Sequence, residues 1–241
     1  MDLFAAVVLL GAIVAGAIAA VAGFGIGSVL TPLLGTVVGV KLAVAMASLP
    51  HVVGTALRLW IVRAHIDRRL LLGFGLTSAA GGLAGAALQS VAASPVLAVV
   101  FAALLLFAGL GGITGYSERL RFDRRGAWIG GALSGVLGGL VGNQGGIRSA
   151  AMLGFDVPKE AFVATSTAVA LIVDAARVPV YLATQGASLG AHAGLIATSV
   201  AGVVAGTLLG TRLLRRVPER IFRRVVGALL VLLGLYTLST L

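Results

Sequence analysis

The sequence predicts an all-α polytopic membrane protein built from two inverted-topology repeats, each a glycine-broken helical hairpin plus three transmembrane helices. Three observations support this fold class. The chain is 59% hydrophobic with a mean hydropathy of +1.09, it aligns on itself at an offset of about 119 residues, and its arginines gather in three short segments. Apolar stretches of about 20 residues have the length needed to cross a hydrocarbon core.

The apolar stretches follow the same order in both halves of the chain. Each half has a first hydrophobic segment, a glycine-rich break, a short apolar piece and three longer spans. In the first half these fall at about 3 to 21, 28 to 39, 42 to 62, 70 to 89 and 95 to 115, and in the second at about 127 to 141, 147 to 155, 160 to 183, 189 to 210 and 221 to 240.

The internal repeat defines the domain organisation. At the offset of about 119 residues, the glycine-rich segment 23 to 27 falls on 142 to 146, and Arg58 falls on Arg177. Self-similarity at a fixed period is the sequence signature of a duplicated unit. We therefore expect a first repeat over residues 1–116, a basic cytoplasmic linker over 117–126 and a second repeat over 127–241.

Loop charges predict the orientation. The segments 63 to 69, 119 to 125 and 212 to 220 are rich in arginine, whereas the turns at 90 to 95 and 184 to 191 carry no charge. Under the positive-inside rule the three basic segments are cytoplasmic, and the uncharged turns and both termini lie outside. The basic loop of one half aligns with the uncharged turn of the other, which predicts opposite topologies for the two halves.

The short apolar pieces predict interrupted helices. Thirteen residues or fewer of helix reach only about 20 Å, too short for a comfortable crossing. We therefore expect each short piece to fold back on the first segment as a broken hairpin. Inverted repeats with interrupted helices are typical of secondary transporters, whose substrate site lies near the midplane.

The two glycine breaks predict an anion site. Irregular backbone at membrane depth is tolerated only inside the protein or beside a wet cavity, and a helix starting at Ser28 or Ile147 would present free N–H groups to an anion. An arginine at this depth is costly and seldom lacks a task. The candidate substrate-binding residues are Gly23, Gly25, Gly27, Ser28, Thr31, Asn143, Gln144, Gly145, Gly146, Arg148, Ser149, Thr165 and Ser166.

Glycine also has a purely structural use, because small residues let membrane helices approach closely. For the pairs Gly81/Gly85 and Gly202/Gly206 we expect this packing role. For the breaks we favour function, because packing does not account for the neighbouring amides and arginine.

Four further ionisable residues are candidates for coupling or gating. Asp174 and Arg177 are three residues apart, close enough for an ion pair that is either internal neutralisation or part of a gate. Arg58 and Arg177 are gating candidates that could instead snorkel towards the membrane surface. His51 could titrate near neutral pH or serve only in helix packing. The hydroxyls of Thr165 and Ser166 could line the cavity or bond back to the helix backbone.

Composition excludes several other classes. Without cysteine there is no disulfide framework and no thiolate chemistry, and the basic residues fit cytoplasmic loops rather than nucleic-acid binding. A membrane enzyme is disfavoured, because the spans contain no carboxylate other than Asp174 and no metal-binding motif is present. A structural scaffold is disfavoured by the cost of the buried arginine. We expect no cofactor and no metal.

At these residues the sequence resembles the TauE/SafE sulfite exporter family, which are anion permeases similar to 4-toluene sulfonate uptake permeases. The resemblance rests on the paired motifs AGFGIGSVLTP and VGNQGGIRSAAM and on ATST at 164 to 167. It implies a multi-pass permease of the bacterial inner membrane that moves sulfite, organosulfonates or related organosulfur and carboxylate anions.

These observations lead to one expected function. We expect a secondary transporter that exports a small anion by alternating access, coupled to H⁺ or Na⁺, with the lipid bilayer as its other partner. An anion channel on the same scaffold is the alternative. The oligomeric state is left open by the sequence.

Overall fold

The computed structural model describes residues 3–22, 24–91, 94–115, 124–141, 148, 159–213 and 218–239. Within these residues every regular element is a helix, which confirms the all-α prediction. The helices are α1 (Leu3–Ala22), α2 (Ile26–Val38), α3 (Val40–Val62), the short 3-10 helix η1 (Arg63–His65), α4 (Arg68–Val91), α5 (Ser94–Thr114), α6 (Arg124–Val141), α8 (Lys159–Ala191), α9 (Ala193–Leu213) and α10 (Glu219–Ser239).

Five helices in the described part of the chain are long and apolar enough to cross a membrane. They are α1, α3, α4, α8 and α9, over Leu3–Ala20, Val40–His65, Arg68–Gln89, Ala164–Ala191 and Ala193–Gly210. The predicted spans at about 95 to 115, 127 to 141 and 221 to 240 are helical as α5, α6 and α10 but are not among these five. The chain is therefore a multi-pass membrane protein.

Helix α1 is apolar on both faces. Its buried face carries small residues at helical spacing, Val8, Ala12, Ala15 and Ala19, whereas its exposed face carries the large residues Leu3, Val7, Leu10 and Val14. A helix that is hydrophobic all round needs an apolar environment on both sides. The buried face meets protein, and the exposed face is suited to lipid.

Helices α1 and α2 form the glycine-broken hairpin predicted for the first half. The break is at Gly25, whose φ of 134° is a backbone conformation that side chains rarely adopt. A Cβ there would also lie 2.5 Å from the side chain of Ile18. Helix α2 starts directly after this residue, two positions before the predicted start at Ser28, and packs on α1 and α3.

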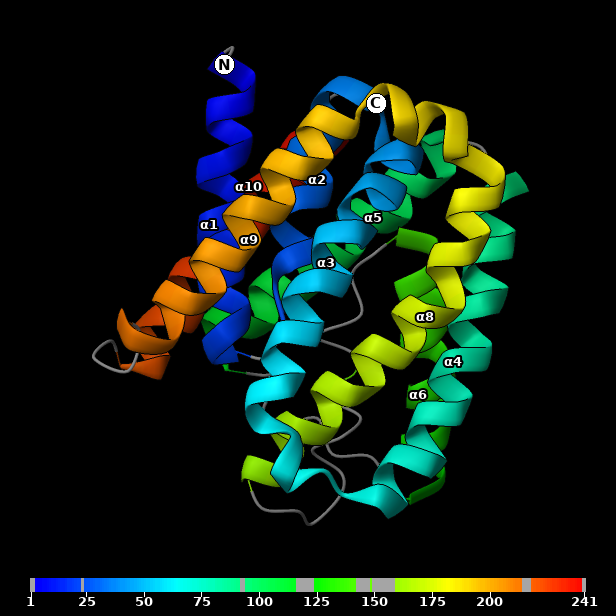
Figure 1. The fold of residues 1–241 in the computed structure, drawn as a ribbon, viewed down its shortest axis with the longest axis vertical. Coiled ribbons are helices and arrows are strands. Elements are labelled where there is room, and N and C mark those ends of the chain that lie inside the picture. Colours follow the sequence, from blue (N-terminus) through cyan, green and yellow to red (C-terminus); the bar gives the residue numbers. More distant parts are fainter. Residues whose placement is uncertain are drawn as a thin grey trace.

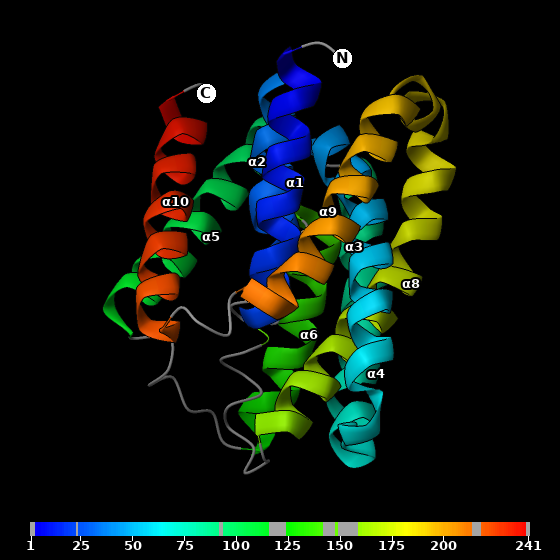
Figure 2. The ribbon, with the colours of Figure 1, turned by 60° about the vertical axis from the view of Figure 1, so that its left-hand side comes forward.

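Helices of the first half pack mainly against helices of the second half. Helix α1 packs on α9, α6 packs on α4, α3 crosses α8, and α5 packs on α10, as Figures 1 and 2 show. Close approach depends on glycine: a Cβ on Gly206 would overlap the carbonyl of Ile13, and one on Gly85 would overlap that of Val136. This confirms the packing role predicted for these glycine pairs.

The two connections that the repeat aligns lie at opposite ends of the molecule. The turn between α3 and α4 is at the lower end of Figure 1, whereas the turn between α8 and α9 and both described termini are at the upper end, and Figure 2 agrees. Trp60, near the lower end of α3, is 69% exposed, and the guanidinium of Arg63 lies 3.5 Å from the centroid of its ring. An exposed tryptophan beside arginine is typical of a membrane interface.

The predicted turn at 184 to 191 was wrong. Helix α8 continues to Ala191, and the connection to α9 is the single residue His192, whose N–H bonds to the carbonyl of Leu189. No proline interrupts this stretch, and its two glycines, Gly186 and Gly190, are exposed and unobstructed. In the same way, α6 begins at Arg124 rather than at 127.

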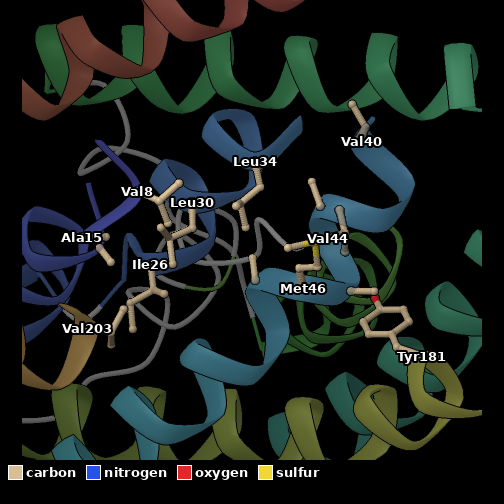
Figure 3. Close-up of a cluster of buried hydrophobic side chains, with 14 of the residues drawn as sticks. Val8, Ala15, Ile26, Leu30, Leu34, Val40, Val44, Met46, Tyr181 and Val203 are labelled. Carbon is tan, nitrogen blue, oxygen red and sulfur yellow. The ribbon is translucent and has the colours of Figure 1, made fainter. Parts of the chain in front are cut away.

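The apolar core lies around α2. Figure 3 shows Ile26, Leu30 and Leu34 of α2 beside residues of α1, α3 and α9. Their spacing of four residues places them on one face of the helix. The buried N-terminal half of α2 is therefore held inside the protein rather than facing lipid, as the break requires.

Candidate functional site

A buried ionic cluster lies where α3 crosses α8. His51 is the twelfth of the 23 residues of α3, and Asp174 is the sixteenth of the 33 residues of α8, so both stand near the middle of their helices. His51 Nδ1 lies 2.6 Å from Asp174 Oδ2. Arg177 places Nε 2.9 Å and Nη2 2.7 Å from Asp174 Oδ1. The ion pair predicted between Asp174 and Arg177 is confirmed, and His51 completes a three-residue cluster.

Arg177 also holds the end of α6. Its Nη1 donates to the carbonyl of Gly138, and the hydroxyl of Tyr181 donates to that of Gly139. Both carbonyls belong to the last four residues of α6, whose oxygens have no partner within the helix. A cation at a helix C-terminus also meets the negative end of the dipole. Arg177 and Tyr181 together cap α6.

Arg58 does the same for α1. Its Nη1 donates to the carbonyl of Ala19 at 2.6 Å, within the last four residues of α1, and its Nε donates to Thr167 Oγ1 at 3.0 Å. Ala19 and Gly138 are 119 positions apart, as are Arg58 and Arg177. Both arginines are buried, at 5% and 1% exposure. The snorkelling alternative was therefore wrong: each arginine reaches inward to a helix end.

Three consecutive hydroxyls near the start of α8 connect separate parts of the protein. Thr165 accepts from the backbone N–H of Asp67, Ser166 from Arg148 Nε, and Thr167 from Arg58. Successive residues of a helix point about 100° apart, so three in a row reach three neighbours. Thr165 and Ser166 thus bond to other parts of the chain rather than back to their own helix backbone, and their role in lining a cavity stays a prediction.

Arg148 is the buried arginine of the described site that has a nitrogen without a hydrogen-bond partner. Its side chain is 1% exposed, and its Nε donates to Ser166 Oγ at 2.9 Å. Its Nη1 is buried and has no hydrogen-bond partner. An unpaired buried donor of a charged group is expensive. Arg148 therefore has a free donor pointing into the protein interior.

The buried charges do not balance. Within the described residues, the buried charged side chains are Arg58, Arg148, Arg177 and Asp174. Arg148 interacts electrostatically with the other three. With His51 neutral, three cations face one anion, a net charge of about +2 in a setting where unpaired charge is costly. An anion entering this region would meet a favourable potential.

The start of α2 adds buried polar groups. Gly25, Gly27, Ser28 and Thr31 are all buried, and Thr31 Oγ1 has no hydrogen-bond partner. The first N–H groups of a helix lack intrahelical acceptors. These four residues of the predicted cradle are thus enclosed by protein.

The structure therefore describes part of the predicted site. It brings together His51, Asp174 and Arg177, joins Arg148 to Ser166, and places Thr165 one residue away. Six of the predicted binding residues lie outside the described residues: Gly23, Asn143, Gln144, Gly145, Gly146 and Ser149.

Sequence reasoning missed two polar residues of the site. Tyr181 is fully buried and caps α6 four positions after Arg177. Thr55 Oγ1 lies 3.4 Å from His51 Nδ1, four positions along α3. Both follow a predicted ionisable residue at helical spacing, a signal that could have revealed them. Among the described residues no group of three or more His, Cys, Asp or Glu could hold a metal ion.

The comparison with protein families identifies the chain. The family described as Sulfite exporter TauE/SafE matches residues 8–237. No curated protein and no solved structure matches the chain. Since the family match covers nearly the whole sequence, the chain belongs to the TauE/SafE sulfite exporter family, and it is a membrane transporter of that family.

Proposed function

We propose that this member of the TauE/SafE family is a secondary transporter that carries sulfite, an organosulfonate or a related organosulfur or carboxylate anion by alternating access. The two halves rock around a site near the midplane of the membrane. Arg148 and the backbone N–H groups of both breaks bind the anion, and Asn143, Gln144 and Ser28 orient it. The family supports export as the direction, and H⁺ or Na⁺ as the coupling ion compensates the charge that moves.

The observation that carries this proposal is the free donor of Arg148. Ser166 fixes the guanidinium through Nε, and the buried Nη1 is left without a partner. Hydrogen bonds to charged groups contribute about 1.5–3 kcal/mol each. A small oxyanion would satisfy this donor and offset the excess positive charge of the cluster. No other buried arginine of the described site has such an unpaired nitrogen.

Many secondary transporters that work by alternating access are built from two repeats of opposite topology, and the helix packing supports this arrangement. If α1 corresponds to α6 and α4 to α9, the contact of α1 with α9 has its counterpart in that of α6 with α4. If α3 likewise corresponds to α8 and α5 to α10, the α3–α8 contact and the α5–α10 contact each join two equivalent helices. The two arginine caps also match atom by atom: Nη1 of Arg58 and Nη1 of Arg177 each donate to a backbone carbonyl, and both the arginines and the carbonyls are separated by the repeat offset.

The Arg148→Ala variant tests the anion site. We expect sulfite affinity of the purified protein to fall at least about tenfold, because one charge-assisted hydrogen bond and one positive charge are lost. Binding is measured by isothermal titration calorimetry in detergent. Arg63→Ala is the matched control, since Arg63 is exposed and stacks on Trp60 outside the site. Unchanged sulfite affinity in Arg148→Ala would remove Arg148 from the site.

Flux through proteoliposomes distinguishes a carrier from a channel. A carrier gives a saturable sulfite flux, because each transport cycle needs a conformational change. Large single-channel currents would contradict alternating access while leaving the anion site in place.

A further inference from the structure

The contact between His51 and Asp174 requires a proton. Nδ1 of the ring and Oδ2 of the carboxylate are 2.6 Å apart, and two bare acceptors would repel each other at this distance. Because Arg177 bonds to the same carboxylate and favours its ionised form, the proton lies on the ring and Nδ1–H donates to Asp174. In the neutral ring Nε2 is then unprotonated, and it is the atom available for a second proton.

The surroundings leave His51 as the entry point for protons. Both oxygens of Asp174 are engaged, one by His51 and the other by Arg177. The side chain of Asp174 has no accessible surface, whereas that of His51 keeps 8%. A proton arriving from solvent would therefore reach His51 before Asp174.

The charges around His51 link its protonation to anion binding. Asp174 and Arg177 of α8 and Arg148 act on His51 electrostatically, and Arg58 of its own helix acts on Asp174. Protonation at Nε2 would raise the net charge of this buried group from about +2 to about +3, which is unfavourable at low dielectric. An anion held by Arg148 lowers that cost. Because binding linkage is reciprocal, the proton also strengthens anion binding.

Na⁺ fits the same cluster poorly. A metal cation is bound by several oxygen ligands at once, and the buried carboxylate of the described site has both oxygens occupied. The three neighbouring arginines would also repel a bound cation. A proton needs only one nitrogen lone pair, which His51 provides.

We propose that His51, held by Asp174, is the proton-binding site of the transport cycle, and that one proton binds at Nε2 together with the anion and crosses with it in the same direction. This inference rests on the proposed anion transport. It selects H⁺ as the coupling ion and symport as the mode of coupling.

The pH dependence of sulfite binding tests it. Sulfite affinity of the purified full-length protein is measured at about pH 6 and about pH 8, on either side of the ordinary range of histidine. The variant is His51→Gln, whose amide can still donate to Asp174. Sulfite itself changes protonation over this range, but it does so equally for both proteins, so the ratio of their affinities isolates His51. His65→Gln, at an exposed histidine, is the control.

We expect the ratio of wild-type to His51→Gln sulfite affinity to be about tenfold larger at the acidic pH than at the basic pH, as for one linked proton. His65→Gln should follow the wild type. Parallel pH profiles for the wild type and His51→Gln would overturn the proton site and leave anion transport intact. If neither sulfite nor a sulfonate or carboxylate measured in the same way bound at either pH, the proposed function would instead be refuted.

A second measurement does not depend on the variant folding. Calorimetry of sulfite binding to the wild type, in two buffers of different ionisation enthalpy, counts the protons taken up. We expect uptake beyond that from the ionisation of sulfite itself. No additional uptake between about pH 6 and about pH 8 would overturn the proposal.

Discussion

Arg58 and Arg177 occupy equivalent positions in the two halves and hold equivalent atoms, but they have different partners. Each donates to a carbonyl in the last turn of the first helix of its half, Ala19 or Gly138. Arg177 is also paired with the carboxylate of Asp174, whereas Arg58 bonds to the neutral hydroxyl of Thr167. The position 119 residues before Asp174 is Thr55.

This difference separates two tasks. The feature common to both halves is an arginine that bonds to a carbonyl in the last turn of the first helix. This role is structural, because that carbonyl has no partner within its helix. The feature found in one half, a carboxylate that also binds a histidine, adjusts charge. Neutralising one arginine and not the other leaves the positive excess on which the proposed anion binding depends. The two halves can share a backbone arrangement and still differ in chemistry.

The largest expected effect is all-or-none and concerns the opposite topology of the halves. The chain has no cysteine, so a single introduced cysteine reports one position. A membrane-impermeant maleimide applied to intact cells should label Ala187→Cys, beside the α8–α9 turn, and should label Ala64→Cys, beside the α3–α4 turn, only after permeabilisation. Labelling of both positions from the same side would end the comparison between the halves.

The next effect concerns the charge difference. Asp174→Asn leaves the buried Arg177 without its counter-charge, and we expect a loss of stability of about 3–5 kcal/mol. Thr55→Ala, at the matching position of the first half, should cost about 1 kcal/mol or less, because only a neutral and long hydrogen bond is lost. Unfolding in detergent is followed by tryptophan fluorescence. Equal losses would show that the two halves do not differ in this way.

The smallest effect concerns the shared packing. Gly16 and Gly135 are 119 positions apart, and a Cβ on either would overlap a backbone carbonyl of the helix opposite, that of Val203 or Ser78. We expect Gly16→Ala and Gly135→Ala to lose similar stability, about 1–3 kcal/mol, since two backbones must separate. The control is Gly190→Ala, with open space around the added methyl group. A large loss of stability for only one of the two variants would show that the two halves also differ in helix packing.

Much of the fold could be predicted from the sequence because lipid leaves few choices. Apolar length, loop arginines and the glycine breaks indicate helices, and the first hairpin closes at Gly25 as expected. The end of α8 was missed because uncharged residues carry no signal that separates a turn from an exposed helix. The partners of Arg58 and Thr165 were missed because they lie 39 and 98 residues away, and no local pattern encodes such contacts.

The sequence by itself determined that this protein is helical and carries ionisable residues inside apolar spans, and it predicted a duplication, because hydropathy and spacing can be read without the tertiary structure. Only the tertiary structure decided which charges meet. It placed His51 against Asp174, turned two arginines towards helix ends and left one nitrogen of Arg148 unpaired. Those outcomes depend on how α3 and α8 cross, because the electrostatic and hydrogen-bond energies of buried groups are set by distances of a few ångströms between residues far apart in the chain.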